Sequence, residues 1–199
     1  MKTSILRFIL GLKRPSKAAN IKLLKERGEE LDSLTIREAV VDDIVDLAQL
    51  HVTAWNQTYP FVKRTPTFET RAYQWNELFK VKDQTWCCFV VVNSKGELVG
   101  FARGKPYTDE LKFDGELNKI YLLKTYQRLG LGRRLVAQVV HRFLTQGINS
   151  MVLFSEPSNP SIRFYEALKG RRLYAANGAF HGGYGWDNLK DLATSLAEQ

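Results

Sequence analysis

The clearest chemical signal in the sequence is a pair of glycines set among basic side chains in YQRLGLGRR, residues 126–134. An apolar segment precedes this stretch and an amphipathic one follows it, so the glycines are expected at a turn from a strand into a helix. The first N–H groups of a helix lack intrahelical partners, and glycine lets the backbone approach an anion closely. The stretch therefore predicts a phosphate-binding loop.

Three known phosphate-binding patterns are candidates for this loop. The dinucleotide-binding pattern requires a third glycine, but Leu135 occupies its place after Gly130 and Gly132. The Gly-Lys-Ser/Thr sequence of a P-loop does not occur in the chain. The third pattern, Gln/Arg-x-x-Gly-x-Gly/Ala after a strand, is matched by residues 127–132.

The other reactive side chains do not form a second catalytic pattern. No His, Cys and Glu residues have the spacing of a metal site, so we expect no metal. Cys87 and Cys88 are adjacent and should point to opposite faces of a strand, which favours reduced cysteines in a cytoplasmic protein. His51 and His141 fall in predicted helices and are expected to be structural.

Hydrophobic periodicity places the loop in a chain of strands and helices. Strands are expected at 34–39, 85–92, 98–107, 115–123, 150–154, 171–176 and 184–188, and helices at 41–55, 67–80, 131–147 and 159–168. The helix after the loop should bury Leu131, Leu135, Val136, Val139, Val140, Phe143 and Leu144. A strand, helix and strand in succession predict an α/β fold with a parallel crossover at its centre.

Several local signals refine these elements. Asp42 or Asp43 is expected near a helix N-cap, and Pro160 at the first position of the last predicted helix. The turn sequence NSKGE should join two strands into a hairpin. The loop between the last two strands is expected to contain Gly178, Gly182 and Gly183.

The first 33 residues are expected to form a basic, helical appendage to a domain that spans 34–199. Residues 1–34 hold eight Lys and Arg against four Asp and Glu, which is half of the chain's net charge of +8. The apolar face of the expected helix consists of Ile5, Ile9 and Leu12. Docking on protein is the default expectation, and contact of residues 1–14 with an anionic membrane is the alternative. Arg7 interrupts the apolar run, which argues against a cleaved signal.

The loop and its surroundings resemble the GNAT superfamily of N-acetyltransferases. Residues 127–132 match the family's acetyl-CoA motif, and they follow the strand sequence NKIYLL at 118–123. Residues 159–168 are similar to the family's Asn-…-Phe-Tyr-Glu helix, and YGWDN at 184–188 looks like its closing strand. The resemblance runs from about residue 34 to 189 and implies a mixed, mostly antiparallel sheet. A splayed parallel strand pair is implied at its centre, with helices on both faces.

The resemblance also implies how acetyl-CoA is bound. Backbone N–H groups in the loop cradle the pyrophosphate, and a free strand edge pairs with the pantetheine amides. The implied strand residues are Ile120, Tyr121 and Leu122. The other implied contacts come from Gln127, Arg128, Leu129, Gly130, Leu131, Gly132, Arg133 and Asn159. Arg128 stands where many members have glycine, and Asn159 lies six residues before Tyr165, one fewer than the commonest spacing.

The resemblance implies that Tyr165 donates a proton or a hydrogen bond to the departing thiolate. An amphipathic core tyrosine is the alternative interpretation. Glu116 matches a position where several relatives carry a catalytic glutamate, and an exposed strand-end carboxylate is the alternative. His181, in the predicted last loop, is a weaker candidate for a base.

The acceptor is expected to be the amine of a small molecule or a peptide, and no residue in the sequence identifies which one. Residues that either line its pocket or belong to the core are Trp55, Tyr59, Phe61, Tyr73 and Trp75. Arg103 has three possible interpretations: it binds a carboxylate of the acceptor, it binds a phosphate of the cofactor, or it binds neither.

The leading hypothesis is an acetyl-CoA-dependent N-acetyltransferase that works by direct attack in a ternary complex. A non-catalytic acyl-CoA-binding or sensor module on the same fold is the alternative. The net positive charge also suggests a nucleic-acid partner. The sequence contains no recognised nucleic-acid-binding motif, so we do not expect such a partner. Homodimerisation is left open.

Overall fold

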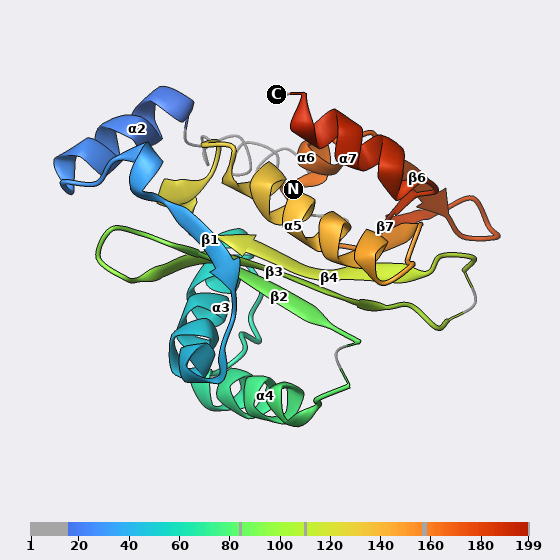
Figure 1. Cartoon of the computed structure of the whole chain (residues 1–199), viewed down its shortest axis with the longest axis horizontal. Coiled ribbons are helices and arrows are strands. Elements are labelled where there is room, and N and C mark those ends of the chain that lie inside the picture. The colour runs from blue at the N-terminus through green and yellow to red at the C-terminus, as the bar shows by residue number, and fades with distance from the viewer. Residues whose placement is uncertain (1–15, 84, 110, 157–158, 199) are drawn as a thin grey trace, which may run out of the picture.

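Seven strands form one mixed sheet between two layers of helices in the computed structural model, which describes residues 16–83, 85–109, 111–156 and 159–198 (Figure 1). In spatial order they are β1 (Thr35–Glu38), β2 (Cys87–Val92), β3 (Leu98–Pro106), β4 (Gly115–Leu122), β5 (Met151–Phe154), β7 (Phe180–Trp186) and β6 (Arg171–Tyr174). The helices of one face are α3 (Ile44–Thr58) and α4 (Phe68–Lys80). Those of the other are α2 (Lys17–Glu26), α5 (Leu131–Thr145), α6 (Ile162–Ala167) and α7 (Leu189–Ala197). Short 3-10 turns are η1 (Leu31–Ser33), η2 (Val41–Asp43) and η3 (Lys124–Tyr126).

The sheet is antiparallel except where β4 runs beside β5. These two strands pair at two positions, Gly115 with Met151 and Glu116 with Val152. Beyond them β4 continues along β3, while β5 continues along β7. The two strands therefore splay apart after Glu116, which confirms the predicted mixed sheet with a central splayed parallel pair.

Alternating strand residues divide the apolar core into two clusters, one on each face of the sheet. The cluster beneath α5 contains Cys87, and the cluster beneath α3 and α4 contains Cys88. The adjacent cysteines point to opposite faces as predicted, and burial raises the pKa of both thiols. The predicted apolar face of α5 is confirmed, with Leu144 partly buried and the rest buried: Leu131, Leu135, Val136, Val139, Val140 and Phe143.

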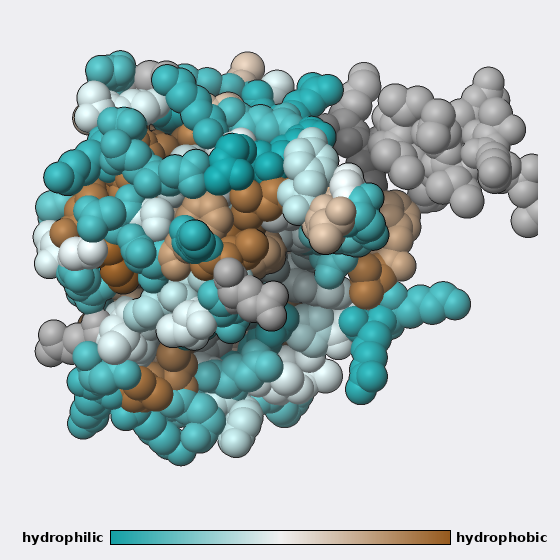
Figure 2. Space-filling model, turned by 90° about the vertical axis from the view of Figure 1, so that its right-hand side faces the viewer, coloured by the Kyte–Doolittle hydropathy of each residue, from teal (hydrophilic) through white to brown (hydrophobic). Residues whose placement is uncertain are grey.

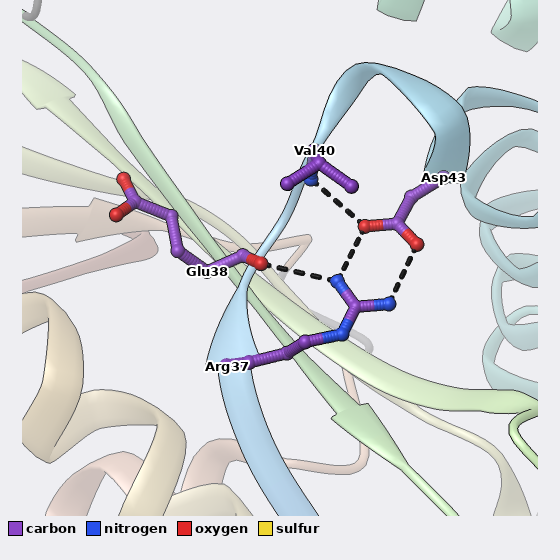
Figure 3. Close-up of polar contacts among 4 residues, drawn as sticks. All are labelled: Arg37, Glu38, Val40 and Asp43. Carbon is purple, nitrogen blue, oxygen red and sulfur yellow. Dashed lines mark hydrogen bonds and ion pairs between the residues drawn. The ribbon is translucent and has the colours of Figure 1, made fainter.

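An ion pair fixes the junction between β1 and α3 (Figure 3). The Arg37 guanidinium donates to both oxygens of Asp43 at 2.6 and 2.7 Å, and the Val40 N–H donates to the same carboxylate at 2.8 Å. Hydrogen bonding from Arg37 lowers the pKa of Asp43. Asp43 holds the predicted N-cap position of α3, but its side chain bonds the preceding turn and not the first helical N–H groups.

The C-terminal hairpin differs from the prediction. β7 begins at Phe180, so Gly182 and Gly183 lie within the strand and not in the loop before it. Gly182 has a φ of 84°, and a Cβ there would lie 1.8 Å from the carbonyl oxygen of Ser155. Gly182 is therefore required because the backbone of β7 lies close to the end of β5. The sequence instead predicts a turn at this glycine.

Two helices also differ from the prediction. Helix α6 begins at Ile162 with Ser161 as its N-cap, so Pro160 precedes the helix and is not its first residue. Helix α7 is not predicted from the sequence. Its Leu189 and Leu192 enter the cluster beneath α5, and such packing stabilises a short helix more than its own propensity does.

The face seen in Figure 2 is largely hydrophilic, with hydrophobic side chains gathered in patches between polar ones. Exposed apolar residues of the whole described surface include Phe61, Tyr73 and Tyr174. Among the described residues, every helix is too short or too polar to cross a membrane.

The end of the predicted appendage packs against the phosphate loop. Asn20 of α2 is fully buried and donates from Nδ2 to the carbonyl oxygens of Lys124, at 3.1 Å, and of Gln127, at 2.7 Å. These carbonyls belong to the turn that leads into the loop. The appendage therefore holds the loop in place through a side chain more than a hundred positions away in sequence.

Two further contacts join the same segment to the domain. Leu24 enters the apolar cluster beneath α5, and the Tyr126 hydroxyl donates to Glu29 at 2.8 Å. The division of the chain at residue 33 stays a prediction. The amphipathic helix predicted within residues 1–14 lies outside the described residues.

We predict that Asn20→Ala lowers the free energy of unfolding by about 1–3 kcal/mol, because two carbonyl oxygens lose their shared donor. Lys17→Ala, an exposed substitution on the same helix, should change it by less than about 0.5 kcal/mol. Urea unfolding measures both values. An unchanged midpoint for Asn20→Ala would mean that α2 does not hold the loop.

Candidate active site

The splay of β4 from β5 opens a cleft of about 450 Å³. Its walls are residues 117–121 of β4, residues 153–156 at the end of β5, and side chains from the surrounding helices and β7. The latter are Trp55, Tyr59, Asn159, Tyr165 and His181. The cleft therefore collects residues from five separate regions of the chain, and several of them are predicted site residues.

A second hollow, of about 610 Å³, lies between β1, α4 and α5 and lacks comparable chemistry. Its lining includes Cys88 and Arg142. Burial raises the pKa of Cys88, which keeps the thiol protonated, and Arg142 donates two hydrogen bonds to Glu38. The cleft at the splay is therefore the better candidate for an active site.

The edge of β4 that faces the cleft carries free backbone groups. The Leu123 N–H donates to Val99 of β3, and alternate residues of a strand direct their N–H and C=O groups to the same side. Tyr121 therefore pairs with β3, while Ile120 and Leu122 face the splay. Of the three predicted strand residues, Ile120 and Tyr121 line the cleft, whereas the Leu122 carbonyl accepts from Gln127.

A β-bulge interrupts β4 at Asn118. Lys119 pairs with Arg103 and Leu117 pairs with Gly104, so Asn118 has no opposite residue on β3. A bulge bends its strand and redirects the side chains beside it. It lies two residues after the last β4–β5 pair, at Glu116, where the two strands begin to diverge.

The phosphate loop presents a row of free N–H groups. Arg128 and Gly130 have φ values of 63° and 83°, in the left-handed region. Among the described residues, the N–H groups of residues 128–133 donate to no acceptor. Successive N–H groups in such a conformation form an anion-binding concavity at a helix N-terminus. The loop has the predicted geometry for a pyrophosphate, and its binding role stays a prediction.

The two glycines of the loop have different structural tasks. Gly130 is the N-cap of α5, and a Cβ there would meet no atom within 4 Å, so its backbone conformation is what favours glycine. A Cβ at Gly132 would lie 3.2 Å from the Phe164 ring of α6. Gly132 therefore allows close packing of α6 against α5.

The long side chains of the loop point away from it. Gln127 donates to the Leu122 carbonyl at 3.0 Å, and Arg133 donates to the Ser195 carbonyl of α7 at 2.8 Å. Arg128 is exposed and has no ion-pair partner among the described residues. The cradle is therefore a backbone feature, and Arg128 is a cation of the loop without an ion-pair partner among the described residues.

Tyr165 lies in the wall of the cleft and is 3% exposed. Burial, with a smaller contribution from the neighbouring Tyr59, raises the pKa of its phenol, which therefore stays protonated. Asn159 donates to the Tyr59 hydroxyl at 3.0 Å and accepts from the Ser161 N–H at 2.8 Å. Asn159 thus positions Tyr59 and the start of α6, while its predicted cofactor contact stays a prediction.

The predicted base, Glu116, is engaged by two partners. Its carboxylate accepts from the Lys105 ammonium at 2.8 Å and from the Asn118 amide at 2.8 Å. Both donors occupy the carboxylate that the predicted role requires to be free. Glu116 is not among the residues that line the cleft, whereas His181 lines it from β7 and not from the predicted loop.

The predicted aromatic residues separate into three groups. Trp55 and Tyr59 line the cleft, with ring centroids 5.2 Å apart. Trp75 is core, and Phe61 and Tyr73 are exposed. The structural role expected for His51 agrees with its packing against Trp75, Phe101 and Tyr121, where burial lowers its pKa to about 2.

Among the cleft residues that are missing from the sequence prediction are Asn118, Lys119 and Glu156. The adjacent polar pair Asn118 and Lys119 inside an apolar strand breaks the period of two, and that break is a signal for a bulge. Glu156 follows β5 without any comparable pattern.

Comparisons with known proteins agree with this geometry. The sequence profile described as "Acetyltransferase (GNAT) family" matches residues 47–170. The uncharacterised N-acetyltransferase YuaI of Bacillus subtilis is 35% identical over 82% of this chain and 98% of its own length. A phosphinothricin N-acetyltransferase of Streptomyces viridochromogenes is 31% identical over 48% of this chain and 55% of its own. PaiA N-acetyltransferase of Thermoplasma acidophilum, solved with coenzyme A, has the same fold, with a TM-score of 0.63 at 19% identity over 77% of this chain and 98% of that one.

We predict that Gly130→Ala weakens coenzyme A binding by about tenfold or more. A left-handed conformation costs an alanine about 1–2 kcal/mol, so the loop should relax away from the cradle geometry. Gly147→Ala is the matched control, because Gly147 has a φ of 77° and open space at the far end of the same helix. Calorimetry should show unchanged affinity for the control despite a similar loss of stability. Equal affinities in both folded variants would rule out the cradle.

Proposed function

The chain belongs to the acetyltransferase (GNAT) family, and from that premise we propose that it transfers the acetyl group of acetyl-CoA to a primary amine. The acceptor is the amine of a small molecule or a peptide. It attacks the thioester directly, within a ternary complex of enzyme and both substrates.

The observation that supports this proposal most is the early divergence of β4 from β5. The backbone groups of Ile120 face the opened side, and the free N–H groups of residues 128–133 follow β4 along the chain. An amide-bearing arm can pair with such a strand edge as an added strand does, while a pyrophosphate takes the cradle. One continuous run of β4 and its following loop therefore offers both kinds of contact that coenzyme A requires.

The residues of the cleft supply part of the chemistry. The reaction forms a bond from the amine nitrogen to the acetyl carbon and breaks the carbon–sulfur bond. The amine loses one proton, and the sulfur needs one as it leaves. Tyr165, buried and protonated, is the donor that we assign to the sulfur. Free N–H groups along β4 can stabilise the negative charge that develops on the carbonyl oxygen.

The removal of the amine proton has two candidate acceptors. Glu116, directly or through a water, is the acceptor implied by the family resemblance, but its carboxylate is engaged by Lys105. His181 lines the cleft and is exposed, so it can pass a proton to solvent. Glu116→Gln and His181→Ala, compared on one acceptor, distinguish the two through the acidic limb of the pH–rate profile.

A panel of amines, assayed by release of the coenzyme A thiol, tests the proposed function. Acetylation of at least one amine class at a rate above thioester hydrolysis supports it. Tight binding of acetyl-CoA without turnover of any amine would favour the alternative, a non-catalytic acyl-CoA-binding module.

We predict that Tyr165→Phe reduces kcat by about 10²–10⁴-fold while acetyl-CoA affinity stays within about twofold, because the ring and its packing survive. Tyr184→Phe is the control, since Tyr184 is equally buried and its hydroxyl has no hydrogen-bond partner among the described residues. Stopped assays at saturating acceptor give kcat. If Tyr165→Phe keeps the wild-type kcat where chemistry limits the rate, Tyr165 is a packing residue.

A further inference from the structure

Four basic side chains gather beside the bulge of β4, on the face of the sheet covered by α3 and α4. We call them the basic cluster: Arg71 of α4, Arg103 and Lys105 of β3, and Lys119 of β4. Lys119 lies two residues before Tyr121, and Arg103 lies two residues after Phe101, so each shares a face with those core aromatics. Lys119 also lines the cleft. The basic cluster therefore reaches the proposed active site through Lys119.

The hydrogen bonds within the basic cluster leave its charge unbalanced. Arg103 and Lys119 both donate to Asn118 Oδ1, at 2.7 and 2.9 Å, so two cations converge on one neutral oxygen. Among the described residues, Glu116 is the only carboxylate in an ion pair with the basic cluster, and its oxygens accept from Lys105 and Asn118. Four cations face one carboxylate that is already engaged.

Two buried donors of the basic cluster have no partner. The Nε atoms of Arg71 and Arg103 are buried and make no hydrogen bond among the described residues. Arg71 donates from Nη1 to Gln74 at 2.8 Å, which is a neutral acceptor on its own helix. Buried polar groups are nearly always paired in folded proteins, so unpaired guanidinium nitrogens beside a cleft need an explanation.

The electrostatic state of Lys119 gives the same picture. Burial, together with the charges of Arg103, Arg71 and Lys105 and against the opposing effect of Glu116, lowers its pKa to about 8. Glu156 is the carboxylate that lines the cleft among the described residues, and its charge acts on Tyr59 and Tyr121. The cations of the basic cluster thus repel one another and disfavour the charged form of Lys119. A bound anion would relieve this repulsion.

We propose that the amine acceptor carries an anionic oxyacid group, a carboxylate or a phosphorus oxyanion, which binds at Lys119 with Arg103 and Arg71 behind it. This inference rests on the proposed function, because it names the class of acceptor for the same site. Guanidinium and ammonium groups are the usual partners of such anions. The charge also selects against polyamines and other acceptors that are purely cationic.

Matched acceptors test the inference with the full-length protein. L-Methionine and L-glutamate are compared with their amides, and an aminoalkylphosphonic acid with its diester, by release of the coenzyme A thiol. We expect kcat/KM for an acid to exceed that of its neutral partner by about tenfold or more. The carboxylate and phosphonate pairs show which anion is preferred. Equal or faster acetylation of the neutral partners, or of spermidine, would overturn the inference and leave the proposed function intact.

Substitution of Lys119 assigns the effect to the basic cluster. Lys119→Met should reduce kcat/KM for the acid about 10–100-fold more than kcat/KM for the amide, while Lys119→Arg restores most of the preference for the acid. Lys190→Met, an exposed change on α7, is the control and should alter none of these values. A loss that is equal for acid and amide would contradict a role in anion binding.

Product binding provides a readout that does not depend on turnover. Calorimetry on the coenzyme A complex compares N-acetyl-L-methionine with its amide, and stronger binding of the acid supports the inference, whereas equal or undetectable binding of both overturns it. Failure of acetyl-CoA itself to bind would instead remove the proposed function.

The binding of the N-acetyl acid should also depend on pH. Its carboxylate is ionised throughout pH 6–10, while Lys119 is charged below about pH 8 and neutral above it. Affinity should therefore fall as pH rises through about 8. The charged and titratable groups whose charges act on Lys119 are Arg71, Arg103, Lys105 and Glu116, with the neutral His51 beside them. The same cleft also holds Glu156, Tyr59, Tyr121, Tyr165 and His181. The arginines stay charged, so binding weakens without vanishing, and a flat profile would contradict the role of Lys119.

Discussion

The two-residue contact between β4 and β5 is the constraint on which the site depends. A longer parallel pairing would satisfy the backbone groups of Ile120 within the sheet and close the cleft. Each strand is instead held along its other edge by an antiparallel neighbour, β3 or β7. The sheet therefore stays continuous while one edge remains free, because the antiparallel ladders carry the stability that the parallel pair does not.

The phosphate loop is held in its conformation from outside. Arg128 adopts a left-handed backbone that ordinarily favours glycine, and such a conformation persists only where surrounding contacts determine it. Asn20 holds the carbonyl of Gln127, and Arg133 reaches the carbonyl of Ser195 in α7. The carbonyl of Gln127 and the side chain of Arg133 thus contact the helices around the loop. The N–H groups of the loop stay free for an anion.

The parts of the site that the sequence predicts are those set by local pattern. The loop at residues 127–132 follows from glycine spacing between a strand and a helix, and the face of α5 follows from its period. The ion pair of Glu116 depends on Lys105, which a neighbouring strand supplies through sheet register. The close approach at Gly182 and the contacts of Asn20 likewise arise from distant segments, and single-sequence periodicity carries no information about them.

The cleft separates two kinds of recognition between different parts of the fold. Contacts suited to coenzyme A come from backbone groups of β4 and of the loop before α5, whose geometry tolerates many side chains. Contacts suited to an anionic acceptor come from side chains such as Lys119 and Arg71, on the face opposite to α5. Side chains on that face can change without moving the backbone cradle, because each face of the sheet has its own apolar cluster. A fold built this way can keep one co-substrate while its acceptor varies with the charge of a few residues.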